Sequence, residues 1–215
     1  MVFPEGVLNM SKPKIAVHKF SSCDGCQLAF LNLGETLLEL PKLVDIVHFA
    51  EAGPMDEDQP VDVALVEGSI NTAHDLERIQ RIRKNSGYLI SIGACATAGG
   101  LQALRNLHDT ARWTAAIYAS PEYIDSLDQV SPIRDVVKVD LELWGCPVNS
   151  RQLVAAVQQL LFGVQPLEQR DKLCLDCKRA GNPCVLISKG EPCLGPVSHT
   201  GCGALCPRFG RACYG

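Results

Sequence analysis

Eleven cysteines constrain the fold of this 215-residue chain more than any other feature. Seven of them fall between Cys174 and Cys213, in short Gly- and Pro-containing loops that lack the apolar periodicity of a core-forming helix or strand. A segment of this kind needs metals or cross-links to hold its shape. An odd number of cysteines cannot pair completely into disulfides within one chain, so metal ligation is the favoured interpretation.

The rest of the sequence indicates a cytoplasmic protein, in which thiols stay reduced. Residues 1–14 contain two prolines and a glutamate but no apolar h-region and no twin arginines, so we expect no secretory leader. No apolar run approaches the roughly 18 residues that cross a bilayer, and we expect no membrane span. In this compartment the cysteines are expected to be metal ligands or redox groups.

The net charge of −4 is unevenly distributed. Residues 170–215 hold seven Lys and Arg against three acids, which gives +4, so residues 1–169 carry −8. A basic patch is compatible with nucleic-acid binding, but here it is interleaved with seven cysteines. Because thiolate-bound metal centres are usually anionic, charge compensation is the simpler explanation, and no nucleic-acid partner is expected.

Residues 1–165 alternate short apolar segments with amphipathic ones, which predicts an α/β fold with an open, mostly parallel sheet. The expected strands are residues 14–20, 44–49, 61–66, 88–92 and 135–143. The expected helices are residues 27–40, ended by Pro41, a helix capped by Asn71 or Thr72 that runs to Lys84, and residues 150–162. The charge shift and a linker near 164–173 predict two domains, residues 1–165 and 166–215.

Four cysteines directly follow predicted strands. Cys23 and Cys26 follow the first strand as Cys-Asp-Gly-Cys, Cys95 follows the fourth and Cys146 the fifth. Because the carboxyl ends of parallel strands share one edge, these four sulfurs are expected to meet there. A thioredoxin-type redox pair, or isolated buried cysteines, are the alternatives. Four thiolates suit a zinc ion or an iron–sulfur cluster, and ligands from separated loops favour the cluster.

The other seven cysteines suffice for one four-sulfur site and most of another. In chain order, the first comprises Cys174, Cys177, Cys184 and Cys193, and the second begins with Cys202, Cys206 and Cys213. A non-cysteine ligand, a three-iron cluster or a chain that continues to another cysteine would each explain the missing fourth ligand. We expect the last, because a cysteine at position 216 would complete Cys-x-x-Cys. Zinc ribbons remain a rival for this segment, since similar spacings serve them.

Several short motifs resemble those of the nickel–iron hydrogenase small-subunit family. They are Cys-Asp-Gly-Cys-Gln-Leu (23–28), Val-Glu-Gly-Ser-Ile (66–70), Gly-Ala-Cys-Ala-Thr-Ala-Gly-Gly (93–100), Gly-Cys-Pro (145–147), Cys-Leu-Gly-Pro (193–196) and Gly-Cys-Gly-Ala-Leu-Cys-Pro (201–207). The resemblance spans Cys23 to Cys213, almost the whole chain. The pattern looks most like the delta subunit of the cytoplasmic, NAD(P)-linked sulfhydrogenase type, in group 3 of the family.

This resemblance implies a flavodoxin-like domain followed by a small, loop-rich iron–sulfur domain. Cys23, Cys26, Cys95 and Cys146 would hold a proximal [4Fe-4S] cluster, and Cys174, Cys177, Cys184 and Cys193 a distal [4Fe-4S] cluster. Cys202, Cys206 and Cys213 would hold a medial [4Fe-4S] or [3Fe-4S] cluster. Membrane-bound and periplasmic relatives have a histidine where Cys174 stands and a twin-arginine leader, so both differences imply a cytoplasmic enzyme.

The resemblance also implies partners. The chain would be one subunit of a hetero-oligomeric hydrogenase, an oxidoreductase whose hydrogen-splitting nickel–iron centre lies in a large subunit. Electrons would pass to flavin- or NAD(P)-binding and further iron–sulfur subunits, or to a ferredoxin-linked partner. The alternatives are the homologous cluster subunit of a complex I-like quinone reductase, and a zinc-stabilised scaffold protein. The spaced Cys23 and Cys26 and the cysteine-rich tail argue against the quinone reductase.

Glu67 and the histidines complete the candidate residues. Glu67 follows the third strand, so it is expected at the same edge as the first four cysteines, either as a cofactor or interface contact or as a helix-capping or solvated carboxylate. The histidines show no ligand spacing, and we expect each to be structural or exposed. They are His18, His48, His74, His108 and His199.

Overall fold

The computed structural model of the chain describes residues 12–168 and 171–215. Most of the N-terminal segment in which no leader is expected, and two residues of the linker, therefore lie outside the described residues. Five parallel strands form one sheet in the order β2-β1-β3-β4-β5, which is the flavodoxin-like order. They are β1 Lys14–Lys19, β2 Asp45–Phe49, β3 Val61–Glu67, β4 Ser86–Ile92 and β5 Leu141–Leu143. The predicted α/β fold is confirmed.

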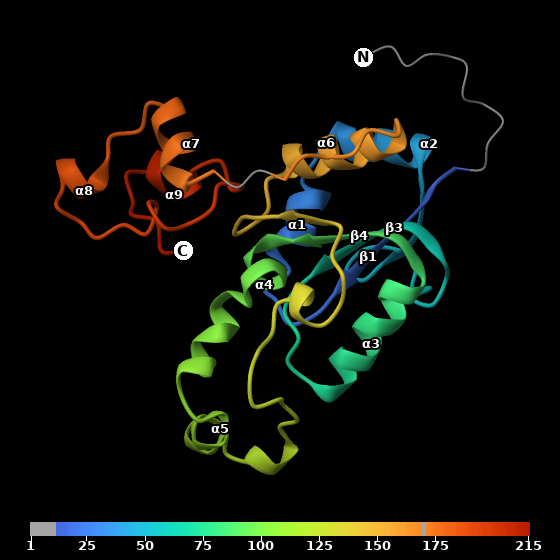
Figure 1. Ribbon diagram of the computed structural model, residues 1–215, viewed down its shortest axis with the longest axis horizontal. Coiled ribbons are helices and arrows are strands. Elements are labelled where there is room, and N and C mark those ends of the chain that lie inside the picture. The colour runs from blue at the N-terminus through green and yellow to red at the C-terminus, as the bar shows by residue number, and fades with distance from the viewer. Residues whose placement is uncertain (1–11, 169–170) are drawn as a thin grey trace.

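Helices cover both faces of this sheet (Figure 1). On one face lie α1 Gly25–Leu31, α2 Glu35–Leu43 and α6 Ser150–Leu161, and on the other lies α3 Ala73–Lys84. Phe30 and Leu153 pack with Leu65 of β3 in the first core, while Ile79 packs with Ala64 in the second. Successive residues of β3 thus point to opposite faces, and both faces are buried, as is usual for a parallel sheet.

The start of α3 lies where the sequence predicts it. Thr72 is the N-cap, its hydroxyl accepts a hydrogen bond from the Asp75 amide at 3.1 Å, and the Asp75 carboxylate accepts one from the Thr72 amide at 3.0 Å. This reciprocal capping box satisfies two amides that the helix cannot pair internally. Of the two capping residues predicted, Thr72 is therefore the correct one.

The helix predicted over residues 27–40 is wrong in two respects. The chain forms two helices separated at residues 32–34, where Gly34 has a φ of 61° that breaks the helical path. Pro41 does not end the second helix but lies inside α2, which runs to Leu43. A proline so close to the helix end removes only one amide hydrogen bond, and the next bond, from Val44 N to Leu40 O at 3.0 Å, still forms.

The last predicted strand is also too long. Only Leu141–Leu143 form β5, and residues 133–135 form a short 3-10 helix, η3 Ile133–Asp135, with a fully buried Ile133. Asp140 marks the boundary, because its carboxylate accepts a hydrogen bond from the Leu89 amide at 2.9 Å and one from the Arg83 guanidinium at 2.6 Å. The edge strand β5, which leads to Cys146, is thus anchored to α3 at its amino end by an ion pair.

We expect the Asp140→Asn variant to lower the free energy of unfolding at pH 7 by about 1–3 kcal/mol, because the partly buried Arg83 loses its charged partner. Burial alone would raise the pKa of Asp140, but the Leu89 amide and Arg83 together hold it below the ordinary value. Its stabilising contribution should therefore be complete above pH 4 and shrink as the pH falls through the depressed pKa. Urea unfolding at several pH values measures this; a loss that does not shrink in acid would contradict it.

The remaining elements surround the sheet edge. Between β4 and β5 lie α4 Gly93–Ala98, η1 Gly100–Leu107, α5 Thr110–Ile117 and η2 Pro121–Tyr123. The C-terminal segment contains α7 Leu173–Arg179, α8 Val185–Ser188 and α9 Leu205–Arg208, and lies to one side of the sheet and its helices (Figure 1). Its core cluster is small and consists of Leu173, Ala204 and Cys213, and Val185 and Ala212 are further buried apolar residues of this segment. The division into domains at residue 165 stays a prediction.

Candidate metal centres

The first thiol group lies at the carboxyl edge of the sheet, where the strand positions predicted it. Cys23 follows β1, Cys26 is the second residue of α1, Cys95 lies in α4 directly after β4, and Cys146 follows β5. The amide of Ala94 donates to the carbonyl of Gly145 at 2.8 Å, which ties the loops of Cys95 and Cys146 together.

The four thiols act on one another electrostatically. Burial is the largest cause that raises the pKa of Cys26, Cys95 and Cys146. The charge of neighbouring thiolates raises it further at all three, and so does the charge of Glu67 at Cys26 and Cys95. Cys23 contributes to the shifts of both Cys95 and Cys146. Closely spaced thiols that are hard to ionise by themselves are suited to a metal centre, because bound metal supplies the positive charge that keeps them deprotonated.

Two glycines keep the space beside these sulfurs open. Gly93 and Gly100 both have positive φ, at 83° and 62°. A methyl group on Gly93 would collide with the sulfur of Cys26, and one on Gly100 would lie 2.6 Å from the sulfur of Cys95. The sequence motif Gly-Ala-Cys-Ala-Thr-Ala-Gly-Gly therefore leaves room for a bulky ligand at these sulfurs.

Glu67 is buried under the first thiol group, with 2% of its surface exposed. Its two carboxylate oxygens accept hydrogen bonds from the first amides of α1, Cys26 N at 3.0 Å and Gln27 N at 3.3 Å. Burial, the largest effect, raises the pKa of Glu67, although these amide bonds oppose it. Of the roles considered, helix capping is what this geometry provides, next to the thiols of Cys26 and Cys95. A cofactor contact stays a prediction.

We expect Glu67→Ala to destabilise the iron-loaded chain by about 1–3 kcal/mol, because two buried amides of α1 lose their only described acceptors. Glu67→Gln should lose less, since its amide oxygen can still accept one of these bonds. Urea unfolding under anaerobic conditions measures the change, with Glu77→Ala on the exposed side of α3 as control. Equal stability of Glu67→Ala and this control would show that the two hydrogen bonds contribute little.

Two polar contacts to sulfur were not predicted. The Val148 amide donates to Cys26 Sγ at 3.4 Å, and the Gln102 side chain lies 3.6 Å from Cys95 Sγ while donating to the Ser21 carbonyl at 2.7 Å. Hydrogen bonds to ligand sulfur adjust the potential of an iron–sulfur centre. A polar residue among the leucines of η1 is the only sequence signal for Gln102, and nothing in the sequence singles out Val148.

The second thiol group surrounds a small cavity in the C-terminal segment. Cys174, Cys177, Cys184 and Cys193 all line this cavity, together with apolar residues that include Leu173, Val185 and Pro196. The Cβ position of Gly195 would lie 3.5 Å from the sulfurs of both Cys174 and Cys193. Burial and the charges of the other three thiols raise the pKa of Cys177. The four cysteines grouped by chain order are therefore neighbours in space.

The last three cysteines are divided between two neighbourhoods. Cys202 and Cys206 are close enough to Cys146 to raise its pKa, so they face the first thiol group. Cys213 is buried, and its amide donates to Cys193 Sγ at 3.2 Å. These three residues thus lie between the first and second thiol groups. Their grouping around one cluster, and the identity of a fourth ligand, stay predictions.

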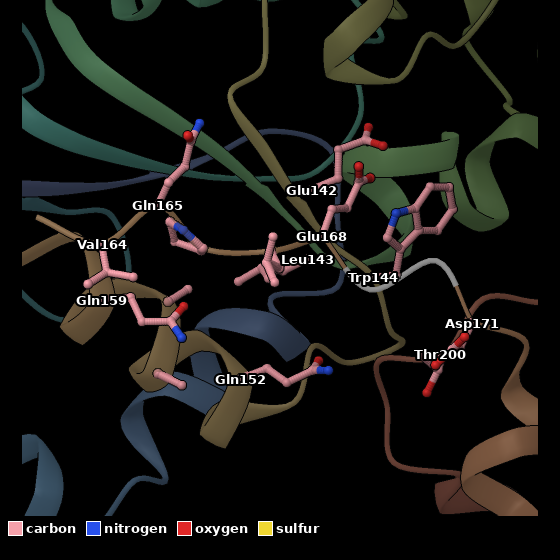
Figure 2. A pocket seen from close by; sticks show the side chains of 14 residues that line it. Glu142, Leu143, Trp144, Gln152, Gln159, Val164, Gln165, Glu168, Asp171 and Thr200 are labelled. Carbon is pink, nitrogen blue, oxygen red and sulfur yellow. The ribbon is translucent and has the colours of Figure 1, made fainter.

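A larger pocket lies where the C-terminal segment meets the sheet (Figure 2). Trp144, Glu142 and Gln152 line it on the sheet side, and Asp171 and Thr200 line it on the other. Beside it, the rings of Trp144 and His199 stack with centroids 4.3 Å apart. Its described lining contains no cysteine, so this pocket is separate from the thiol groups.

Comparison with known proteins identifies the family. A model of the family described as "NADH ubiquinone oxidoreductase, 20 Kd subunit" matches residues 23–160, which include the first thiol group. The chain therefore belongs to this family, and the relatives described next are hydrogenase subunits. The resemblance to nickel–iron hydrogenase small subunits is thus confirmed.

Two relatives extend the match beyond the sheet. The chain is 34% identical to sulfhydrogenase 2 subunit delta of Pyrococcus furiosus over 94% of its own length and 84% of the relative's. It is 32% identical to a vhu-type subunit of the F420-non-reducing hydrogenase of Methanocaldococcus jannaschii, over 94% and 80% of the two chains. Because each match covers 94% of the chain, both extend into the cysteine-rich tail, which the family model does not cover.

A solved structure agrees with the fold. A chain in the crystal structure of an NAD⁺-reducing [NiFe]-hydrogenase in the H₂-reduced state matches with a TM-score of 0.67 and 28% identity, over 73% of this chain and 95% of that one. These relationships support an electron-transfer role in a hydrogenase. Within the described residues no helix is long and apolar enough to cross a membrane.

Proposed function

We propose that this chain is the electron-transfer small subunit of a nickel–iron hydrogenase, located in the cytoplasm, and that its cysteines bind three iron–sulfur clusters. The observation that carries the proposal is the succession of thiols. Cys146 of the first group neighbours Cys202 and Cys206. The Cys213 amide donates a hydrogen bond to the sulfur of Cys193 in the second group. These two links support a row of sulfur ligands that runs from the sheet edge into the tail.

The residues present suit iron–sulfur ligation. Thiolate sulfur is the ligand that such clusters use, and bound clusters would accept and release single electrons. The chain's own contribution is to hold the sulfurs, to keep space open at Gly93 and Gly100, and to donate hydrogen bonds to sulfur from Val148 and Gln102. Apolar residues, including Leu173, Val185 and Pro196, lie beside the four cysteines of the second cavity. The basic charge of residues 170–215 offsets the negative charge of thiolate-bound iron.

An exposed apolar stripe supports docking of a large subunit beside the first thiol group. Leu101, Leu104 and Leu107 of η1 are 79%, 58% and 74% exposed. A 3-10 helix has three residues per turn, so leucines three apart lie on one face. This stripe directly follows α4, which carries Cys95, and contiguous exposed leucines mark protein contacts. The hydrogen-splitting nickel–iron centre is proposed to lie in the subunit that covers it.

Electrons would leave at the other end, through the tail. Its net charge of +4 suits an acidic electron acceptor, which we propose to be a flavin- and NAD(P)-binding subunit, a further iron–sulfur subunit or a ferredoxin-like protein. The tail also exposes Ile187, Val197 and Phe209, which gives such a partner apolar contact area.

Anaerobic purification from the native host, with a tag on this chain, tests the proposal. We expect a brown preparation with about eight to twelve iron atoms per chain, in line with two or three clusters of up to four irons. We also expect a nickel-containing large subunit to co-purify. A colourless chain that contains zinc and no iron would instead support the zinc-stabilised scaffold and contradict the proposal.

A further inference from the structure

Two buried histidines lie side by side away from the cysteines. His18 is in β1 and His48 is in the neighbouring β2, where the parallel register pairs Ala16 with His48. The imidazole rings stack with centroids 4.7 Å apart and an interplanar angle of 25°. Both residues are only 2% exposed. The sequence shows no ligand spacing here because 29 intervening residues, counted between positions 18 and 48, separate two strands that only the sheet brings together.

Most of the polar atoms of this pair lack a partner. Nδ1 of His18 and both ring nitrogens of His48 are buried without a hydrogen bond in the part of the chain that the structure describes. Each such atom destabilises the folded chain if it stays unsatisfied. Burial, the leading cause, lowers the pKa of His18 to about 3 and also lowers that of His48. Both rings are therefore neutral near pH 7, which is the form that binds metal ions.

Glu57 completes a set of three ligand groups. It belongs to the loop between β2 and β3, which folds back over β2 through the bond from Phe49 N to Pro54 O at 2.9 Å. Glu57 Oε1 lies 3.9 Å from His18 Nδ1, and one ligand atom from each of the three residues falls within 4.8 Å of the others. Tetrahedral zinc with bonds of about 2.0–2.2 Å separates its ligands by about 3.4 Å, so modest side-chain movement closes the site.

Some charged residues near the three ligand groups oppose the binding of a cation, and others favour it. Arg78 donates hydrogen bonds to Glu57 and to the Lys19 carbonyl, and lies over the Phe20 ring with 4.5 Å to its centroid. The positive charge of Arg78 opposes the binding of a metal ion nearby. Its hydrogen bond to Glu57, however, holds the carboxylate in place, as outer partners of metal ligands commonly do. The negative charges of Asp56 and Glu57 both act to raise the pKa of His48, and the same charges favour a cation beside this ring.

We propose that His18, His48 and Glu57 bind one divalent transition-metal ion of the zinc class. Two imidazoles and a carboxylate are an established zinc ligand set. The ion would pin the β2–β3 loop to the sheet and would give a partner to Nδ1 of His18 and to one ring nitrogen of His48. Lys19 already links this loop to the cysteine loop, through ion pairs with Glu51 at 2.7 Å and Asp24 at 2.8 Å. The site would therefore brace the segment that presents Cys23. It does not depend on the proposed electron-transfer function.

Zinc titration of the full-length, iron-loaded chain tests this site, because loaded thiols no longer compete for added zinc. After anaerobic gel filtration with a mild chelator, zinc and iron are counted per chain in the wild type and three variants. His48→Phe removes a ligand but keeps a buried ring. Glu57→Gln removes the carboxylate charge but keeps the shape of this half-buried loop residue. His74→Gln, which alters an exposed histidine on α3, is the control.

We expect one retained zinc in the wild type and in His74→Gln, none in His48→Phe, and at least a tenfold weaker dissociation constant in Glu57→Gln, with iron content unchanged in all four. The proposal is overturned if the wild type retains no zinc, or if Glu57→Gln and His48→Phe bind zinc as the wild type does. Should His48→Phe fail to fold, Glu57→Gln against His74→Gln decides the question. The iron count separately reports on the proposed cluster ligands.

Discussion

The Cys26→Ala variant is expected to lose about four iron atoms per chain and to stop hydrogen-dependent electron flow, while the tail keeps its iron. Cys26 is the most deeply buried of the first thiol group, with 7% of its surface exposed. Neither water nor a surface side chain can therefore take the place of its sulfur. The change also leaves the Val148 amide, which donates to this sulfur, without its acceptor.

Iron analysis, and reduction of an artificial dye by the purified complex under hydrogen, measure these effects. Ser22→Ala is the matched control, because Ser22 lies in the same loop and bonds Asp24 without contacting the sulfur of Cys26. We expect this control to keep its iron and its activity. Full iron content and activity in Cys26→Ala would remove Cys26 from the proposed ligands and leave the first site without its central member.

Removing the iron by chelation under reducing, anaerobic conditions is expected to unfold residues 171–215 and to leave the sheet folded. The tail has one small core cluster, of Leu173, Ala204 and Cys213, whereas the sheet has two extensive cores, one on each face. Segments with so little core fold only with their metals. Ile187, Val197 and Phe209, already exposed, add nothing to the stability of the tail by itself.

Amide hydrogen exchange resolves the two regions within one chain. Without iron, the amides of α7 and that of Cys213 should exchange at rates close to those of an unfolded chain, while Leu65 and Ile90 in the central strands stay protected. The strands serve as the internal control. A tail that stays protected without iron would mean that its own packing suffices, and would contradict the prediction.

The sheet and the first thiol group were predictable because both follow from strand positions. Alternating apolar segments located the five strands, and the rule that parallel strands share one carboxyl edge brought Cys95 and Cys146 to Cys23. The errors arose where one local interaction outweighs a pattern. Pro41 is tolerated near the end of α2. Before β5, the Asp140 side chain takes the Leu89 amide as its hydrogen-bond partner, so strand pairing stops there although the apolar pattern in the sequence continues.

Other features needed three dimensions. The sequence predicted Glu67 at the correct edge of the sheet. Only the structure shows that its carboxylate accepts hydrogen bonds from two amides of α1. His18 and His48 looked unremarkable because the sheet order β2-β1-β3, rather than sequence spacing, makes them neighbours. The tail cysteines could be grouped by order, but the contacts of Cys202 and Cys206 with Cys146 depend on how the tail packs.

The central claim is that this chain carries electrons through iron held by its cysteines. Electron paramagnetic resonance of the anaerobically purified complex, before and after exposure to hydrogen, tests it most directly. We predict signals of reduced iron–sulfur clusters that appear under hydrogen and whose first-site component is missing in Cys26→Ala. A hydrogen-active complex in which no cluster signal from this chain changes, or in which the chain holds only zinc, would contradict the claim.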